Sequence, residues 1–223
     1  NAGLYTDMVD PEQNMGRHER GSLPLGRLLM FREGVNNSVA VVANKYNDGN
    51  LTLHLTGHWV STTEFHGRLH LRFLGHLPML FARTPGSVAV IGYGTGITTG
   101  TVLLHPHVRK VDVFELEAGV IDAAPYFNFI NHHPLEDSRT RVFTLDGRSH
   151  LTYEKSTYDV ITADPIHPFV AGAANLYSQD FYRVAQRRLN KGGVFCQWIP
   201  LAAISEEAFK TILNSIHSIF PHV

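Results

Sequence analysis

The sequence predicts an α/β protein, with a parallel β-sheet covered by helices on both faces and a small antiparallel sheet before it. Two observations carry this prediction. From residue 87 onward, short apolar runs alternate with stretches of helical spacing, which is typical of sheets built from β-α-β units. Between residues 26 and 62, strand-like runs follow one another with only turns between them, which is the pattern of antiparallel hairpins.

The composition indicates a folded protein and excludes several classes. The 223 residues are 43% hydrophobic and 17% charged, which is too apolar for a disordered chain. A formal net charge of -1 argues against a nucleic-acid binder that neutralises phosphates. No apolar run reaches the roughly 18 residues of a membrane span, so we expect no membrane insertion of this segment. The single cysteine, Cys196, excludes an internal disulfide and favours a reducing, cytoplasmic compartment.

The first two segments are a lead-in and a small β domain. Residues 1–25 are polar, carry several glycines and prolines, and show no periodicity. Residues 26–65 form the small domain, in which Asp48-Gly49 separates two strand-like runs and favours a hairpin turn, because such a turn needs positive φ. Because the chain begins with Asn1 and has no signal-peptide pattern, we expect it to be cut from a longer protein.

Residues 66–223 form the predicted larger domain. It opens with a helix over residues 66–82, where leucine and phenylalanine recur at helical spacing. Ser205 is expected to cap the last helix. The remaining elements alternate, with strands over 88–91, 111–114, 142–145, 160–163 and 194–198, and helices over 98–104, 120–131, 178–189 and 205–220.

A glycine-rich loop follows the first strand of this domain and leads into a helix. Gly92, Gly94 and Gly96 allow the backbone to turn tightly and to approach a ligand closely. Glu115 ends the next strand, where a carboxylate can accept both hydroxyls of a ribose. The pattern favours a nucleoside-type ligand, and the alternative for Glu115 is a solvated strand end.

Two more carboxylates follow later strands. Asp146-Gly147 follows the third strand, where Asp146 could accept from an adenine amino group or simply belong to a turn. Asp164 follows the fourth strand. Because ligands of open α/β sheets bind beyond the carboxyl ends of the strands, we expect Glu115, Asp146, Asp164 and the glycine loop to share one crevice.

Six stretches in natural order resemble the spermidine synthase family of aminopropyltransferases, and through it the Rossmann-like class I methyltransferase fold. Residues 26–62 are also similar to that family's N-terminal β-strand annex. The fold normally continues with two further strands, which would lie beyond Val223, so we expect residues 204–220 to be partly uncovered and to offer a partner surface. The six stretches are 88–96, 111–120, 137–147, 158–164, 176–182 and 189–197.

The resemblance implies a transfer reaction and a role for each matching position. Decarboxylated S-adenosylmethionine would give its aminopropyl group to a small amine acceptor, without a metal, and Asp164 would accept the proton of the attacking amine. The resemblance also leaves room for a homodimer. The positions implied at the cofactor are Gly92, Tyr93, Gly94, Gly96, Glu115, Asp146 and Gly147, and those implied at the substrate are Thr95, His167, Tyr177 and Gln197.

Three positions depart from the family pattern. Thr95 stands where the family usually has an aspartate, and His167 replaces the second aspartate of its Asp-Ser-Ser-Asp-Pro motif. His70-Leu71-Arg72 stands in place of a Tyr-His-Glu stretch. The half of the site that would hold a dicationic polyamine therefore lacks carboxylates. This pattern is closer to the spermidine-synthase-like domains that bacteria fuse to membrane transporter-like segments.

These departures leave two alternatives open beside aminopropyl transfer. One is a methyltransferase that uses S-adenosylmethionine, and the other is a nucleoside-binding domain without catalysis. Three residues also have competing interpretations. Tyr93 could stack on a ligand or plug the loop against the sheet. His66 and His70 have metal-binding spacing, but no acidic or cysteine partner lies nearby in the sequence. Cys196 is expected to be an inert core thiol.

Overall fold

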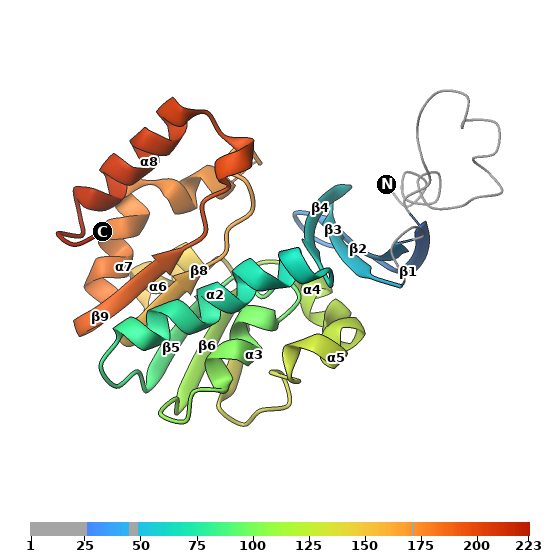
Figure 1. Ribbon diagram of the computed structural model, residues 1–223, viewed down its shortest axis with the longest axis horizontal. Coiled ribbons are helices and arrows are strands. Elements are labelled where there is room, and N and C mark those ends of the chain that lie inside the picture. Colours follow the sequence, from blue (N-terminus) through green and yellow to red (C-terminus); the bar gives the residue numbers. More distant parts are fainter. Residues whose placement is uncertain (1–25, 45–48, 171) are drawn as a thin grey trace.

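The computed structural model describes residues 26–44, 49–170 and 172–223 (Figure 1). It contains a four-stranded antiparallel sheet and a five-stranded sheet whose neighbouring strands are all parallel. Both predicted sheets are therefore confirmed. The lead-in over residues 1–25 lies outside the described residues.

The antiparallel sheet keeps the order of the sequence. Its hairpin between the second and third strands pairs Ala43 with Leu51, which confirms the hairpin predicted around Asp48-Gly49, although residues 45–48 lie outside the described residues. Gly49 has a φ of 78°, in the region that glycine favours. The strands are β1 (Gly26–Glu33), β2 (Ser38–Asn44), β3 (Leu51–Leu55) and β4 (His58–Thr62).

The parallel sheet has the order β7-β6-β5-β8-β9. The chain enters at the central strand, runs outward to one edge, and returns to the other side of the centre. The strand order therefore reverses between β5 and β8, and a crevice for a ligand opens at such a point. The strands are β5 (Ser87–Ile91), β6 (Lys110–Glu115), β7 (Thr140–Thr144), β8 (Tyr158–Ala163) and β9 (Leu189–Gln197).

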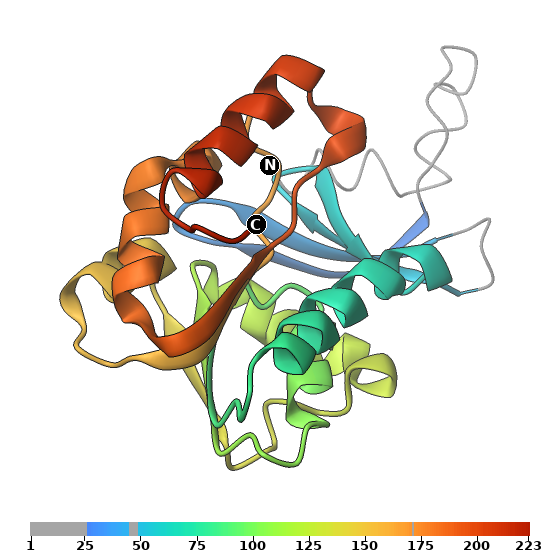
Figure 2. The ribbon, with the colours of Figure 1, turned by 60° about the vertical axis from the view of Figure 1, so that its left-hand side comes forward.

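Helices cover both faces of this sheet, and α7 and α8 lie on the side of β9 away from α2 (Figure 2). One face carries α2 (Phe65–Phe81), α3 (Ile97–Leu103), α4 (Ala118–Ala123), the 3-10 turn η2 (Ala124–Phe127) and α5 (Asn128–Asn131). The other face carries α6 (Gly147–Tyr153), the 3-10 turn η3 (Ala173–Tyr177), α7 (Gln179–Arg188) and α8 (Glu206–His217), and the 3-10 turn η4 (Leu201–Ala203) precedes α8.

One predicted helix is interrupted. The single helix expected over 120–131 is divided into α4, η2 and α5, with Pro125 at the start of the 3-10 turn. Proline has no backbone N–H to donate, so it breaks the i to i−4 hydrogen-bond series. The cap of the last helix agrees with the sequence, because the amide of Ala208 donates to Oγ of Ser205 at 3.2 Å.

The core divides into two layers because successive strand residues point to opposite faces. Val88 and Val90 of β5 pack with α2 and α3, whereas Ala89 and Ile91 pack with α6 and α7. The apolar side chains of residues 204–220 are buried or half-buried, and Phe220 stacks on Phe195 with ring centroids 5.4 Å apart.

A stripe of exposed apolar side chains lies on α2 rather than on the last helix. The exposed side chains of the stripe are Phe65, Leu69, Phe73, Leu77, Leu80 and Phe81.

None of the helices within the described ranges combines the length and the apolar character that crossing a membrane requires.

A buried carboxylate joins three strands of the sheet. Asp112 of β6 is 1% exposed. It accepts hydrogen bonds from Nε of Arg141 and from the hydroxyl of Tyr158, both at 2.8 Å, and Nζ of Lys110 lies 2.8 Å away. Burial alone would raise the pKa of Asp112, but the hydrogen bonds from Arg141, Lys110 and Tyr158 hold it below its ordinary value.

We expect Asp112→Asn to lower the free energy of unfolding by about 3 kcal/mol at pH 7, because it removes the buried charge that Arg141, Lys110 and Tyr158 all contact. A carboxyl with a lowered pKa in the folded state stabilises the protein above its ordinary pKa of about 4, and this stabilisation is lost as the pH falls further. The difference between the two proteins should therefore shrink in acid. Urea denaturation measures this difference, with Asp180→Asn as the control, since Asp180 is an exposed carboxylate that forms a surface ion pair with Arg183 at 3.0 Å. A loss below about 0.5 kcal/mol would contradict the prediction.

Candidate functional site

The glycine loop and the carboxylates predicted for the crevice follow β5, β6, β7 and β8 at their carboxyl ends. Close contacts connect them. The amide of Tyr93 in the loop donates to Oε2 of Glu115 at 2.9 Å, and a Cβ at Gly92 would lie 3.2 Å from the carbonyl oxygen of Asp164. A Cβ at Gly147 would lie 3.1 Å from Phe114, which precedes Glu115. The predicted residues therefore gather at one edge of the sheet.

Each glycine of the loop has a backbone that favours glycine. The φ angles of Gly92, Gly94 and Gly96 are 87°, 53° and 77°. A Cβ at Gly96 would lie 2.5 Å from the hydroxyl oxygen of Tyr93, so a side chain there has no room. A Cβ at Gly94 would meet no atom within 4 Å. Gly94 therefore faces open space at the loop, where a ligand could approach the backbone.

Glu115 supports the glycine loop. Its Oε2 accepts the amide of Tyr93, and its Oε1 accepts the amide of Glu117 at 3.0 Å. Burial raises the pKa of Glu115, while hydrogen bonds from the amides of Glu117, Tyr93 and Gly94 oppose this rise. Four backbone amides, those of Tyr93, Gly94, Leu116 and Glu117, bond this carboxylate and hold it at the end of β6.

Asp146 begins α6 and borders a hollow. It accepts hydrogen bonds from the amide of Arg148 at 3.1 Å and from the hydroxyl of Ser149 at 2.7 Å, so it caps the helix. The hollow beside it has a volume of about 320 Å³ and is lined by Leu145, Asp146, Ser149, His150, Tyr153 and Glu154.

The side chains of two loop residues, Tyr93 and Thr95, are buried. For Tyr93 this agrees with the alternative that its ring plugs the loop against the sheet, and for Thr95 it differs from the expected contact with the substrate. The ring of Tyr93 is 3% exposed and packs in the core under the loop. The side chain of Thr95 is buried, with its hydroxyl 3.3 Å from Oγ of Ser61 in β4. Both residues can reach a ligand through the backbone alone, because their side chains are used for packing.

Asn131 holds the glycine loop from its buried side, a role that was not predicted from the sequence. Its Nδ2 donates to the carbonyl oxygen of Thr95 at 2.9 Å, and its Oδ1 accepts the amide of His133 at 3.0 Å. Its own carbonyl oxygen packs against α3, where a Cβ at Gly100 would lie only 1.7 Å away. A glycine inside a predicted helix was the one available signal that another backbone comes close there.

The antiparallel sheet contacts the same edge. Nδ2 of Asn37 donates to Oε1 of Glu117 at 3.1 Å, next to Glu115. Arg32 of β1 forms an ion pair with Asp122 of α4 at 2.7 Å. Together with the contact between Ser61 and Thr95, these bonds fix the small sheet beside the glycine loop, so it borders the crevice.

Asp164 is the half-buried carboxylate at the end of β8. Its amide donates to the carbonyl oxygen of Ile91 at 3.1 Å, which places it at the reversal of strand order. Burial raises the pKa of Asp164 to about 7. A carboxyl with this pKa is close to half-ionised at neutral pH, so it can accept and release a proton.

The predicted substrate residues lie around Asp164. The hydroxyl of Tyr177 donates to the carbonyl oxygens of Pro165 and Ile166 at 3.2 and 3.3 Å, which fixes the segment after Asp164. Nε2 of Gln197 donates to the carbonyl oxygen of Leu176 at 3.0 Å. The ring of His167 meets Trp198 edge to face, with centroids 5.5 Å apart. Trp198 is a residue that the sequence analysis did not assign to the site.

The other candidates from the sequence have ordinary surroundings. His70 lies beside Trp198, with ring centroids 5.8 Å apart. Over the described part of the chain, no three His, Cys, Asp or Glu side chains are grouped closely enough to hold a metal ion. Burial raises the pKa of Cys196 to about 11, so its thiol is protonated and unreactive at neutral pH.

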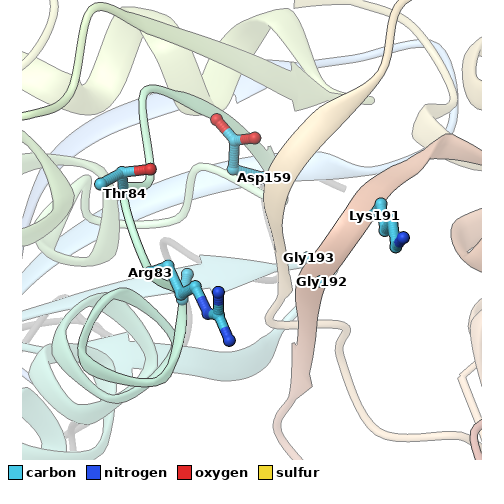
Figure 3. Close-up of a pocket in the computed structure, with 7 residues that line it drawn as sticks. Arg83, Thr84, Asp159, Lys191, Gly192 and Gly193 are labelled. Carbon is cyan, nitrogen blue, oxygen red and sulfur yellow. The ribbon is translucent and has the colours of Figure 1, made fainter.

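A second hollow, of about 390 Å³, opens at the opposite edge of the sheet (Figure 3). Arg83 and Lys191 lie on two sides of it, and Asp159 lies at the start of β8. One oxygen of Asp159 accepts the amides of Gly86 and Ser87, and the other accepts Nδ2 of Asn190. Asp159 therefore joins the amino ends of the strands. The hollow beside it lies at that edge of the sheet, whereas the predicted crevice lies at the carboxyl ends.

The sequence is similar to one known protein family and to curated members of it. A family model described as the spermine/spermidine synthase domain matches residues 69–223. A polyamine aminopropyltransferase of Bacillus mycoides (strain KBAB4) is 30% identical over 162 residues, which are 73% of this chain and 58% of that protein. One from Shouchella clausii (strain KSM-K16) is also 30% identical, with the same coverage. The chain therefore spans a little over half the length of the curated relatives that it matches.

Solved structures of spermidine synthases are also similar to this chain. A crystal structure of a spermidine synthase in complex with the transition-state analogue AdoDATO superposes with a TM-score of 0.78 and 25% identity, over 87% of this chain and 66% of that chain. The spermidine synthase from Thermotoga maritima gives a TM-score of 0.76 and 26% identity, over 87% of this chain and 65% of that chain.

Proposed function

The chain belongs to the spermine/spermidine synthase family, and from this premise we propose that it transfers an aminopropyl group from decarboxylated S-adenosylmethionine to a small amine. One observation carries the proposal. A carboxylate with a pKa of about 7, Asp164, lies beside the glycine loop at the reversal of strand order. The relatives named polyamine aminopropyltransferases support the same reaction class.

The nucleoside donor fits the residues of the crevice. Gly94 leaves the backbone open to a ligand, and Glu115 ends the neighbouring strand β6, where the ribose hydroxyls of a nucleoside would lie. The hollow beside Asp146 offers room and an acceptor for an adenine amino group. When bound, the donor supplies an electrophilic carbon next to a sulfonium. The chain contributes position and electrostatics, which account for much of the rate in such displacements.

Asp164 would prepare the amine for attack. An amine must be neutral to act as a nucleophile, and an ionised carboxylate within reach can accept its proton. Since the pKa of Asp164 is about 7, the carboxylate form dominates only above neutral pH. The rate should therefore rise as the pH passes through about 7.

Product analysis tests the proposed reaction. The protein is incubated with decarboxylated S-adenosylmethionine and a panel of monoamines and diamines, and methylthioadenosine is measured. Its amine-dependent release supports the proposal. Release of S-adenosylhomocysteine from S-adenosylmethionine would instead indicate methyl transfer, and binding of either donor without any product would indicate a non-catalytic nucleoside-binding domain.

We expect Gly94→Ala to weaken methylthioadenosine binding at least about tenfold, because a Cβ there would enter the space proposed for the ligand and close contacts govern such loops. Gly192→Ala is the matched control. Gly192 also has a positive φ, 78°, and its Cβ would also meet no atom within 4 Å, but it lies at the opposite edge of the sheet. The two variants should therefore lose similar stability through backbone strain. Calorimetric titration that finds equal affinities would remove Gly94 from the site.

The remaining expectations rest on the sequence and stay proposals. They are a cytoplasmic location, a homodimer and a division at about residue 65. Analytical ultracentrifugation of the purified protein tests the homodimer, and cell fractionation tests the location.

A further inference from the structure

Three rings from separate parts of the chain gather beyond the carboxyl ends of β8 and β9. They belong to His70 of α2, His167 of the segment after β8, and Trp198 just after β9. The centroid of Trp198 is 5.8 Å from that of His70 and 5.5 Å from that of His167. Phe169 extends this group, because it stacks on His167 at 5.1 Å. His70, His167 and Trp198 are called the ring cluster below.

The ring cluster is adjacent to Asp164. The amide of Trp198 donates to the carbonyl oxygen of Ala163 at 3.0 Å, and Asp164 is the next residue. His167 follows Asp164 by one short segment, which Tyr177 holds in place through two carbonyl oxygens. An amine that reaches Asp164 would therefore have its remaining atoms close to these rings.

The segments that form this region carry a single carboxylate. Residues 65–81, 164–177 and 197–204 contain no aspartate or glutamate other than Asp164. Burial lowers the pKa of His70, so its ring is neutral near pH 7. A second ammonium group would thus find no second carboxylate in these segments, which is an unfavourable exchange for its hydration.

Resting on the proposed function, we infer that the preferred acceptor is a monoamine with an aromatic or other apolar body, which packs on the ring cluster while its amino group meets Asp164. Flat apolar groups gain contact area and favourable ring geometry against tryptophan and imidazole rings. A linear diamine of similar length would leave one charge without a partner. The ring cluster is therefore a specificity-determining feature of the acceptor side.

Competition between two amines tests this inference. Methylthioadenosine release is measured with 2-phenylethylamine and with 1,4-diaminobutane, and kcat/KM should favour the aromatic monoamine at least about tenfold. A preference for the diamine would overturn the inference and leave the transferase proposal intact. If neither amine gives product, the wider amine panel decides the transferase proposal. Calorimetry of both amines with methylthioadenosine present then still decides the inference, which fails if the diamine binds equally or more tightly.

Two variants test the ring cluster directly. Trp198→Ala should raise KM for 2-phenylethylamine about five- to tenfold, whereas Phe129→Ala, which removes an exposed ring on α5, should not change it. His167→Asp should shift the preference toward the diamine at least about fivefold by supplying a second carboxylate. His107→Asp makes the same charge change between α3 and β6, at the opposite edge of the sheet, and should leave the preference unchanged. Unchanged preference in both aspartate variants would contradict the assignment.

Discussion

Asp164→Asn should reduce methylthioadenosine release by roughly 10²- to 10⁴-fold, because an amide cannot accept the proton of the attacking amine. Binding of methylthioadenosine should change little, since Gly94 and Glu115, rather than Asp164, are proposed to hold the nucleoside. In the unmodified protein the rate should rise as the pH passes through about 7, which is the pKa of Asp164. A pH profile of the residual activity in the variant should lack this rise.

The same substitution should stabilise the protein at high pH. A carboxyl whose pKa is raised in the folded state binds its proton more tightly there, so folding loses stability as the pH rises from about 4 to above 7. Asparagine removes this loss, and we expect a gain on the order of 2 kcal/mol at pH 8 after allowance for partial exposure of the group. Near pH 4 the gain should vanish.

Measuring both the rate and the stability of Asp164→Asn separates a catalytic role of Asp164 from a structural one. Asp180→Asn serves as the control, since Asp180 is an exposed residue of α7 and should affect neither rate nor stability. A variant at Asp164 that keeps its rate would exclude the proposed base. A variant that loses rate and stability together would indicate that Asp164 supports the fold.

Gly100→Ala should lower the free energy of unfolding by about 3 kcal/mol or prevent folding, although alanine is the better helix former. The reason is that its Cβ would lie 1.7 Å from the carbonyl oxygen of Asn131, which is a backbone atom and cannot swing away. Because Nδ2 of Asn131 also holds the carbonyl oxygen of Thr95, any shift should reach the glycine loop and weaken nucleoside binding.

Gly86→Ala provides a matched control for this clash. Its Cβ would lie 2.6 Å from Nη2 of Arg109, the far end of a flexible side chain that can move. We expect a loss below about 1 kcal/mol there. Urea denaturation compares the two variants, and equal losses would show that the contact with Asn131 does not constrain α3.

The sequence was sufficient for the elements that depend on local chemistry. The alternation of strands and helices, the turn at Asp48-Gly49 and the cap at Ser205 follow from backbone preferences of a few adjacent residues. Gly92, Gly94 and Gly96 indicated a tight turn of the backbone for the same reason, and all three have positive φ. The break in the helix at Pro125 also has a local cause. It was not predicted, because the apolar residues on both sides of Pro125 continue the helical spacing.

What only the tertiary structure decided is which side chains face the crevice. Tyr93 and Thr95 stand in the loop, yet their side chains turn into the core and toward β4. Asn131 supports the loop, and Trp198 joins His167, across intervals of 36 and 31 residues. Such contacts depend on the order in which strands pair and on how helices pack over them. The sequence of this protein by itself therefore determined its fold class and the carboxylates at the strand ends, and long-range packing determined the walls of the site around them.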